Sequence, residues 1–264
     1  MSFFMGVDVG STSTKIVIIK EGKLESYRVT PSGAHFERSV QSGIEEALEQ
    51  LSLSTNDING TIATGYGANI PFLADHYVTD ISCCAKGVGY LFPFVRTVID
   101  IGGQASKVIR VNQEKEAIHF VVSERCAAGS GRFLQVIAKV LQIKLEDIGP
   151  LSLKAQNPIT FTTACAVFGE SEAVSRVAEG IPIEDIIAGV HNSIATKIAN
   201  LVNQIGMEQD CVLTGGGALD EGLVKKIRER LGVDLLIPSQ PQITAALGAA
   251  IIAEEKYSHQ HDNE

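Results

Sequence analysis

The sequence predicts an α/β protein made of two similar lobes. Short apolar segments alternate with longer amphipathic segments, which is the pattern of strands interleaved with helices. One strand–turn–strand segment also occurs twice, opened by Val7-Asp8-Val9-Gly10 and again by Ile99-Asp100-Ile101-Gly102. The Asp, Gly and Lys of this segment recur at a constant offset of 92 residues: 8 and 100, 10 and 102, 15 and 107.

The first half of the chain is predicted to form a three-stranded meander, a helix and a fourth strand. Apolar, partly β-branched segments separated by Gly-containing turns predict strands over residues 3–8, 14–20 and 24–30. A helix is predicted over residues 36–51, because an apolar stripe recurs there at helical spacing. A short strand over residues 61–64 then ends at Gly65-Tyr66-Gly67.

The second half repeats the meander and adds more helices. Strands are predicted over residues 97–101, 106–111, 117–123, 211–214 and 235–237. Helices are predicted over residues 132–141, 166–178, 183–205, 219–230 and 244–256. No linker rich in Pro, Gly or Ser separates the halves, so we expect closely packed lobes. We expect the first lobe over residues 1–94 plus 245–264 and the second over residues 95–244.

Composition and charge exclude several classes of protein. The chain has 264 residues, 45% of them apolar, which is enough for a substantial core. Its formal net charge of −9 argues against nucleic acid and anionic membrane surfaces as partners, because both attract basic proteins. No apolar run approaches the roughly 20 residues of a membrane span, and no cleavable leader is evident, so a cytoplasmic protein is expected. Five Cys, an odd number, favour free thiols, metal binding or redox chemistry over a disulfide framework.

The first repeated turn, residues 8–15, is rich in small and hydroxyl side chains and predicts a phosphate-binding site. Gly10 tolerates backbone angles that turn N–H groups inward, and hydroxyl groups donate to phosphate oxygens. Lys15 can neutralise phosphate charge, and Asp8, at a strand end, can hold Mg²⁺ through water. Asp8 is thus a candidate catalytic residue, and the candidate nucleotide-binding residues are Gly10, Ser11, Thr12, Ser13 and Lys15.

The second turn, residues 100–107, follows the same logic. Asp100 and Gln104 are candidate catalytic residues, since Gln orients the attacking water in other nucleotide hydrolases. The backbone of a Gly triplet after a predicted strand can approach a flat ring such as adenine. The further candidate nucleotide-binding residues are therefore Gly102, Gly103, Lys107, Gly215, Gly216 and Gly217. The alternative is that each turn is only a tight hairpin with a capping Asp.

These three motifs, in this order, resemble those of the sugar kinase, heat-shock-70 and actin superfamily. The chain has no Gly-x-x-x-x-Gly-Lys-Ser/Thr motif, and the repeated turns lack the dinucleotide-binding Gly-x-Gly-x-x-Gly spacing, which excludes P-loop and Rossmann proteins. The resemblance implies an α/β, duplicated actin-like (ribonuclease H-like) ATPase fold. It further implies two lobes around a nucleotide cleft, with ATP or ADP and Mg²⁺ bound there.

Two of the five Cys, Cys126 and Cys165, stand out by their placement. They lie 39 residues apart and neither belongs to a Cys-x-x-Cys pair, so a zinc ribbon is not supported. Each precedes a predicted helix, whose free N–H groups and dipole favour a thiolate. Two thiolates are half of the set that a four-iron cluster requires, and a two-fold homodimer would complete it. The alternative is two ordinary, partly buried thiols.

The sequences around these Cys resemble two motifs of the activators of 2-hydroxyacyl-CoA dehydratases, which are grouped with the ATPase subunits of benzoyl-CoA reductase. The motifs are residues 124–133 and 163–172, and plain sugar kinases lack them. Further matching segments cover nearly the whole chain: residues 63–67, 82–83, both turns, 187–191 and 246–250. The resemblance implies one [4Fe-4S] cluster that bridges a homodimer, held by Cys126 and Cys165 of each subunit.

The same resemblance implies an ATPase coupled to one-electron transfer in an anaerobic setting. Ferredoxin or flavodoxin would be the reductant. The acceptor would be an iron–sulfur enzyme: a 2-hydroxyacyl-CoA dehydratase, an aromatic acyl-CoA reductase or a double-cubane cluster protein. The family usually has Asp where Ala105 follows Gly-Gly-Gln. This departure implies slower ATP hydrolysis, greater reliance on Asp8 and Asp100, or a divergent subgroup with another partner.

Two alternative functions stay open, and several residues have a simpler interpretation. The second candidate is a small-molecule (sugar-type) kinase of the same superfamily, and the third is a non-catalytic, actin-like or regulatory ATP-binding protein. A kinase needs a carboxylate base beside a sugar site, and the sequence indicates none. The remaining notable residues are interpreted as core thiols (Cys83, Cys84 and Cys211), helix-start charges (Glu170 and Glu172) and a structural imidazole (His191).

Overall fold

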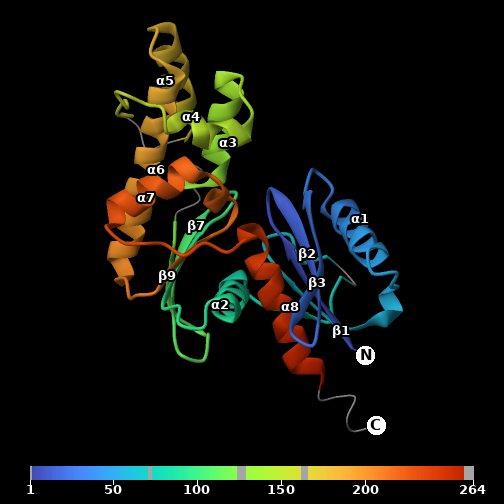
Figure 1. Cartoon of the computed structure of the whole chain (residues 1–264). Helices are drawn as coiled ribbons and strands as arrows, with labels where there is room; N and C mark the ends of the chain where they lie inside the picture. The colour runs from blue at the N-terminus through green and yellow to red at the C-terminus, as the bar shows by residue number, and fades with distance from the viewer. Residues whose placement is uncertain (1, 71–72, 124–128, 162–165, 259–264) are drawn as a thin grey trace. The chain divides into compact units, whose positions relative to one another are not determined.

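The computed structural model describes residues 2–70, 73–123, 129–161 and 166–258 (Figure 1). The chain divides into two compact units. The first contains Met1–Val95, Val111–Ile118 and Pro238–Glu264, and the second contains Arg96–Arg110 and His119–Ile237. Strands and helices occur in both units, so the α/β class predicted from the sequence is confirmed.

The first unit contains a five-stranded sheet in the order β3-β2-β1-β4-β5. Its strands are β1 (Phe3–Val9), β2 (Ser13–Lys20), β3 (Lys23–Pro31), β4 (Ile58–Thr64) and β5 (His76–Tyr77). Its helices include α1 (Phe36–Glu49), α2 (Asp80–Leu91) and α8 (Thr244–Tyr257), with 3-10 turns at Thr55–Asp57 and Pro241–Ile243.

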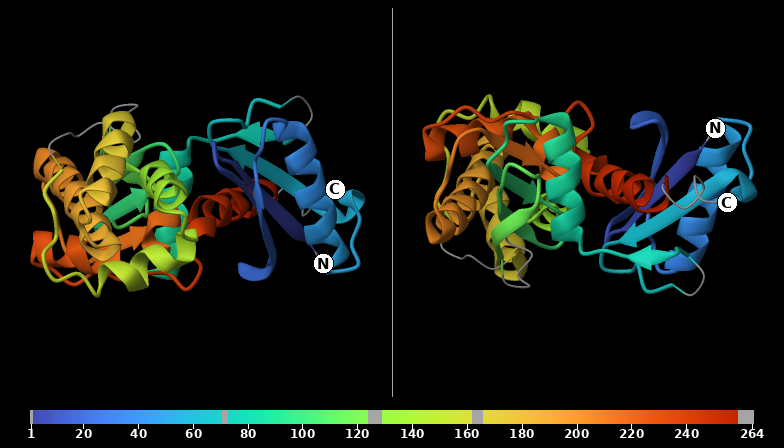
Figure 2. Two further views of the ribbon diagram at one scale, coloured as in Figure 1. Left: turned by 90° about the horizontal axis from the view of Figure 1, so that it is seen from above. Right: turned by 90° about the horizontal axis from the view of Figure 1, so that it is seen from below.

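Helices cover both faces of this sheet because its central strands are apolar on both sides. On one face, alternate residues of β1 such as Val7 pack with the apolar stripe of α1. On the other face, Phe4 of β1 packs with α8 residues such as Ala246. Figure 2 shows α1 (blue) and α8 (red) on opposite faces of this sheet. Gly6 permits the close approach of α8, since an added Cβ would lie 1.9 Å from the Ala246 carbonyl oxygen.

A four-stranded sheet in the order β8-β7-β6-β9 lies mostly in the second unit, since only Val111 of β7 and the first two residues of β8 belong to the first. Its strands are β6 (Thr97–Ile101), β7 (Ser106–Val111), β8 (Ala117–Val122) and β9 (Cys211–Thr214). The helices of the second unit include α3 (Gly131–Leu141), α4 (Ile148–Ser152), α5 (Ala166–Ala178), α6 (Ile183–Ile205) and α7 (Glu221–Leu231), with 3-10 turns at Leu145–Asp147 and Gly216–Leu219. One apolar core joins β6 residues such as Ile99 and Ile101 to α3, α6 and α7.

The two sheets share one topology. In each sheet, the strand that bears the repeated Asp pairs antiparallel with the next strand and parallel with a later one. The first set is β1 with β2 and β4, and the second is β6 with β7 and β9. The repeat in the sequence is therefore a repeat of structure, as expected for two similar lobes.

The prediction of a strand over residues 235–237 is wrong. The other predicted strands and helices form, with small shifts at their ends. Leu236 makes one isolated parallel bridge to Val212, and Pro238, which has no backbone N–H, follows closely. The helix predicted from residue 219 begins at Glu221, because the Asp220 side chain caps it. The short elements α4 and β5 were not predicted, because so few residues carry little periodic signal.

Candidate functional site

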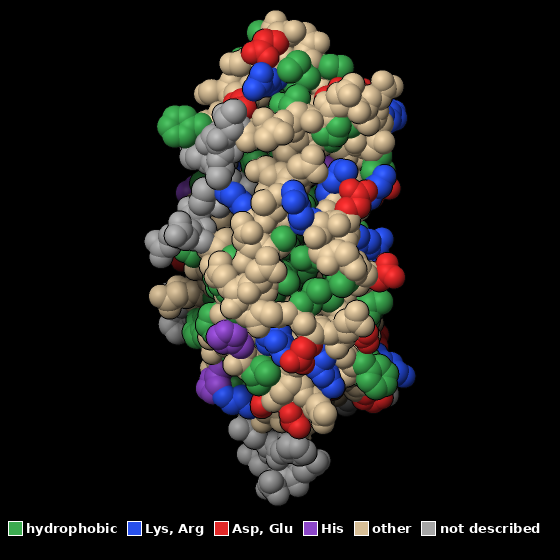
Figure 3. All heavy atoms as spheres, turned by 90° about the vertical axis from the view of Figure 1, so that its left-hand side faces the viewer, with side chains coloured by type: hydrophobic (Ala, Val, Ile, Leu, Met, Phe, Trp, Pro, Cys, Tyr) green, Lys and Arg blue, Asp and Glu red, His purple; other side chains and the backbone are tan. Residues whose placement is uncertain are grey.

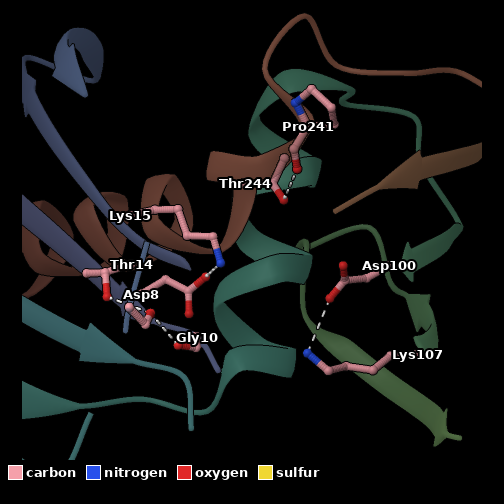
Figure 4. Close-up of polar contacts among 9 residues, drawn as sticks. Asp8, Gly10, Thr14, Lys15, Asp100, Lys107, Pro241 and Thr244 are labelled. Atoms are coloured by element: carbon pink, nitrogen blue, oxygen red, sulfur yellow. Dashed lines mark hydrogen bonds and ion pairs between the residues drawn. The ribbon is translucent and has the colours of Figure 1, made fainter. Parts of the chain in front are cut away.

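The first repeated hairpin places a carboxylate and an ammonium group side by side. Asp8, one residue before the end of β1, lies directly opposite Lys15 of β2 in the antiparallel register. The Lys15 Nζ atom lies 3.0 Å from Asp8 Oδ2, and the side chains are 15% and 12% exposed. Figure 4 shows the two side chains pointing toward one another. The hairpin thus offers a candidate Mg²⁺ ligand beside a candidate phosphate partner.

The turn of this hairpin is closed by backbone and hydroxyl contacts. The N–H of Gly10 donates to the Ser13 carbonyl (3.1 Å), and an added Cβ on Gly10 would lie 2.8 Å from that oxygen. The Ser32 hydroxyl donates to the Gly10 carbonyl (2.7 Å) and lies 3.0 Å from the Thr14 hydroxyl (Figure 4). The three predicted hydroxyl residues occur together in this turn and are partly exposed: Ser11, Thr12 and Ser13.

The second repeated hairpin reproduces this geometry. Asp100 of β6 lies opposite Lys107 of β7, and the Lys107 Nζ atom lies 3.2 Å from Asp100 Oδ2 (Figure 4). Each of these side chains is 14% exposed. The N–H of Gly102 donates to the Ala105 carbonyl (3.0 Å), as Gly10 does to Ser13 in the first turn. Gln104 is exposed in this turn, and its role in orienting water stays a prediction.

A helix is docked on the second turn, whereas the hydroxyl and the N–H of Ser32 hold the first. The N–H of Gly131 donates to the Gly102 carbonyl, and the N–H of Arg132 donates to the Gly103 carbonyl, both at 2.9 Å. These donors belong to the first residues of α3, which have no acceptor within their own helix. The candidate phosphate turn therefore satisfies two N–H groups at the start of α3.

A second repeated element, missed by the sequence analysis as a repeat, lies beside each carboxylate. β4 runs into Thr64-Gly65-Tyr66-Gly67, and β9 runs into Thr214-Gly215-Gly216-Gly217. The first Gly of each loop has a positive φ, 93° and 81°. An added Cβ there would lie 2.4 Å from Asp8 Oδ1 in one loop and 2.3 Å from Asp100 Oδ1 in the other. The two loops could have been recognised as equivalent from the sequence, because each has the pattern Thr-Gly-x-Gly directly after an apolar strand.

The Gly triplet continues into a buried polar pair between α6 and α7. Asp220, directly after the 3-10 turn Gly216–Leu219, donates its N–H to the Gly217 carbonyl (3.3 Å). Its Oδ1 accepts from the N–H of Leu223 (2.9 Å), and its Oδ2 lies 3.0 Å from His191 Nε2. His191 is wholly buried. The interaction therefore ties α6 to the end of the candidate adenine loop.

The predicted cluster ligands, Cys126 and Cys165, lie outside the described residues. Within the described ranges, no group of three or more His, Cys, Asp and Glu is placed to hold a metal ion. Cys83, Cys84 and Cys211 are buried, as predicted. Burial raises the pKa of Cys83 and of Cys211 to about 12. Both therefore stay protonated at neutral pH, which does not fit a metal ligand.

Away from the hairpins, α5 carries a local ion pair. Glu172 pairs with Arg176 one turn later on α5, at 3.5 Å. On the face drawn in Figure 3, Lys and Arg side chains lie among Asp and Glu side chains, unlike the basic field that binds nucleic acid. In the part of the chain that the structure describes, no helix has the length and apolar character required to cross a membrane.

Comparisons with known proteins agree with this geometry. A model of the BadF/BadG/BcrA/BcrD ATPase family matches residues 5–253. The activator of lactoyl-CoA dehydratase from Anaerotignum propionicum is 40% identical over 254 residues, which cover 96% of this chain and 98% of the relative.

Solved structures of two similar proteins superpose closely on this chain. Component A of (R)-2-hydroxyglutaryl-CoA dehydratase from Acidaminococcus fermentans has a TM-score of 0.93 at 37% identity, covering 98% of this chain and 100% of that chain. The activator of 2-hydroxyisocaproyl-CoA dehydratase from Clostridium difficile, with bound ADPNP, has a TM-score of 0.93 at 34% identity, covering 99% and 98%. The duplicated actin-like fold implied by the sequence is confirmed.

Proposed function

Because the chain belongs to the BadF/BadG/BcrA/BcrD ATPase family, we propose that it is an ATPase that passes single low-potential electrons to an iron–sulfur partner enzyme. A 2-hydroxyacyl-CoA dehydratase is the favoured acceptor, since the similar proteins are named activators or components of such dehydratases. An aromatic acyl-CoA reductase and a double-cubane cluster protein are the other acceptors of this chemistry. The observation that carries the proposal is the pair of equivalent Asp–Lys hairpins, each beside a Gly loop packed on the Asp carboxylate.

The two hairpins contain the groups that an Mg²⁺–nucleotide requires. Lys15 and Lys107 would partner phosphate oxygens, and Asp8 and Asp100 would hold Mg²⁺ through water. Gln104 would orient the attacking water. The proposed contacts to ATP or ADP further include backbone and hydroxyl groups of the loops: Gly10, Ser11, Thr12, Ser13, Gly102, Gly103, Gly215, Gly216 and Gly217.

Cys126 and Cys165 of two identical subunits are the proposed ligands of one [4Fe-4S] cluster. They are the two Cys in the family motifs, and both belong to the proposed second lobe, residues 95–244. The buried Cys83 and Cys211, whose pKa is raised to about 12, do not compete for iron. A cluster held by these thiolates would supply one electron at a time, with ferredoxin or flavodoxin as the proposed reductant. Raising one electron by a few hundred millivolts costs roughly 5–10 kcal/mol, which explains the need for ATP.

Iron and acid-labile sulfide, measured on protein purified without oxygen, test the redox part of the proposal. We expect about four iron atoms per homodimer, lost in Cys126→Ser and in Cys165→Ser. Cys211→Ala removes a buried thiol that the proposal does not use, and this matched control should keep its iron. A chain without iron after anaerobic reconstitution contradicts the electron-donor function and favours the sugar-type kinase.

Steady-state ATP hydrolysis tests the nucleotide part. Asp8→Asn and Asp100→Asn each keep the side-chain volume but remove the charge, so kcat should fall at least about tenfold at saturating Mg²⁺. Asp75→Asn is the control, because Asp75 accepts a backbone hydrogen bond from Thr61 (2.7 Å) rather than facing a Lys. Equal rates in all three variants would contradict the assignment, and stimulation by a sugar would favour the kinase.

A further inference from the structure

Ser106 joins the second hairpin to two other segments of the second unit. It is the first residue of β7 and is wholly buried. Its N–H donates to Ser123 Oγ (3.0 Å), and its carbonyl accepts from the N–H of Ser123 (2.8 Å). Its hydroxyl donates to the Gly129 carbonyl. One residue therefore holds both the chain beyond β8 and the chain leading into α3.

The start of α3 also determines how the turn presents its amides. Gly131 and Arg132 donate to the carbonyls of Gly102 and Gly103. In a planar trans peptide the C=O and the following N–H point in opposite directions. The N–H groups of Gly103 and Gln104 therefore point away from α3. These are two backbone donors of the turn that the proposed function assigns to phosphate, so docking of α3 preorganises them.

The first hairpin provides an internal comparison. Thr14 occupies the position equivalent to Ser106, 92 residues earlier, and is also wholly buried. Its hydroxyl lies 3.0 Å from Ser32 Oγ, which in turn donates to the Gly10 carbonyl. Ser32, one residue after β3, thus holds the first turn through its hydroxyl and through its N–H, which donates to the Thr12 carbonyl (3.0 Å), whereas the N-terminal residues of a helix hold the second. The two hairpins share their Asp–Lys pair but differ in what positions the turn.

We propose that Ser106 is a positioning residue for phosphate binding at the second hairpin. Through Gly129 it fixes the start of α3, and through α3 it aims the amides of Gly103 and Gln104 at the phosphate chain of a nucleotide. Bound phosphate in turn stabilises the hydrogen bonds that Gly131 and Arg132 make. This inference rests on the proposed nucleotide-binding function and assigns the residues that preorganise one of its two phosphate turns.

Two measurements on Ser106→Ala, Ser106→Thr and Thr14→Val test the inference. Amide hydrogen exchange by NMR, without ligand, should be about tenfold faster at Gly131 and Arg132 in Ser106→Ala, as expected for one lost buried hydrogen bond. Ser106→Thr should restore slow exchange, because the chain itself carries Thr at the equivalent position. Thr14→Val, the matched control, should leave exchange at Gly131 and Arg132 unchanged.

Calorimetric titration with Mg²⁺ and either inorganic pyrophosphate or ADP is the second measurement. Ser106→Ala should weaken both ligands about tenfold, and Ser106→Thr should recover the affinity. Unchanged exchange and affinity in Ser106→Ala, or failure of Ser106→Thr to restore them, overturns the inference. A wild-type chain that binds neither ligand contradicts the proposed function instead, and the exchange comparison still tests Ser106.

If Ser106→Ala does not fold, amide exchange of the wild-type protein with and without pyrophosphate tests the inference instead. Protection of the Gly131 and Arg132 amides should rise at least about fivefold when pyrophosphate binds. The amide of Gly67 is the internal reference, since it donates to the Val9 carbonyl (2.9 Å) beside the first hairpin. A response at Gly67 with none at Gly131 or Arg132 overturns the inference.

Discussion

At the scale of single residues, the candidate site depends on two glycines whose missing side chains leave room for a carboxylate. Gly65 and Gly215 both have positive φ, and both face the Oδ1 atom of an Asp. Any other residue would be strained by the backbone conformation and would also displace the carboxylate. The lack of a Cβ at these two glycines therefore positions each Asp–Lys pair as much as the paired side chains do.

Gly215→Ala separates these two effects when it is compared with Gly232→Ala. Gly232 also has a positive φ (68°), but an added Cβ there meets nothing within 4 Å. Gly232→Ala should lower the free energy of unfolding by about 1 kcal/mol through backbone strain. Gly215→Ala should lower it by about 3 kcal/mol or more, because Asp100 Oδ1 and the Ile101 carbonyl oxygen, 2.3 and 2.5 Å from the added Cβ, must also move. Urea unfolding of both variants measures the difference. Equal losses in the free energy of unfolding would show that the carboxylate and its neighbours move away from the added Cβ at little cost.

Ala105→Asp should accelerate ATP hydrolysis severalfold. The family resemblance implies Asp at this position, and Ala105 is partly exposed in the second turn, so a carboxylate fits there without burial. A gain in kcat at unchanged KM would assign the Asp a role in the transition state. A slower enzyme would show instead that this chain has adapted its Mg²⁺ or water site to the lack of that carboxylate.

Alkaline pH should destabilise the protein through its buried thiols. Burial raises the pKa of Cys83 and of Cys211 from 9.0 to about 12. A folded-state pKa above the unfolded value contributes stability below pH 9, and this contribution is lost progressively as the pH rises from 9 to 12. Cys83→Ala and Cys211→Ala should therefore lose less stability between pH 8 and pH 11 than the parent chain. Urea midpoints at these pH values measure the difference, and parallel losses would contradict it.

At the scale of elements, α7 is fixed at its start by one carboxylate with two tasks. Asp220 caps the helix through Leu223 and also accepts from the buried His191. Among the described residues, the other ring nitrogen of His191, Nδ1, has no partner. Such a buried, half-satisfied imidazole costs stability, so the pair serves to fix how α6 and α7 meet rather than to maximise stability.

A double-mutant cycle measures that coupling. Asp220→Ala should lower the free energy of unfolding by about 1 kcal/mol through loss of the helix cap. It should lower it by about 1–3 kcal/mol more, because the buried His191 loses its hydrogen-bond partner. Asp220→Asn keeps an oxygen for the cap and should cost clearly less. In a His191→Met background, Asp220→Ala should lose only the capping part. Additive losses in urea unfolding would show that the two side chains do not interact.

The sequence predicted strands and helices well wherever the signal is local. The hairpins were found because Asp, Gly and Lys lie within eight residues of one another and recur at one offset. The matching loops after β4 and β9 were not recognised as a pair, because the chain between each hairpin and its loop differs in length. The interaction of Ser106 with Gly129 was invisible for a related reason: Ser is common, and only the fold brings it to that carbonyl.

At the scale of the whole molecule, duplication of the sheet explains why one repeated motif predicted both the fold class and most candidate nucleotide contacts. Two sheets of the same topology each carry a hairpin and a Gly loop. The fold class and most candidate nucleotide contacts therefore followed from one repeat and a family resemblance. The ligand pair Cys126 and Cys165 followed from the family resemblance, since placement alone left two ordinary thiols as the alternative; both lie outside the described residues, so the pair stays a prediction.

Mg²⁺–ADP should stabilise the whole chain against heat. At a ligand concentration of about 100 times Kd, binding adds about 2.7 kcal/mol, which corresponds to a rise in Tm of roughly 5–10 °C for a protein of this size. Differential scanning fluorimetry measures the shift. Asp8→Asn and Asp100→Asn should each reduce it. An unchanged Tm in the parent chain at millimolar Mg²⁺–ADP would count against nucleotide binding.

The paired side chains of the hairpins also bear on ion selectivity. With Nζ and Oδ2 only 3.0 and 3.2 Å apart, each hairpin carries its own counterion and presents little net charge to a passing ion. Chloride would have to compete with the Asp carboxylate for the Lys ammonium group. A lone metal cation would have to compete with the Lys ammonium group for the Asp carboxylate. A ligand that brings an anion and a cation together would exchange both partners at once, so the proposed nucleotide site would favour metal–phosphate complexes over the separate ions that surround it.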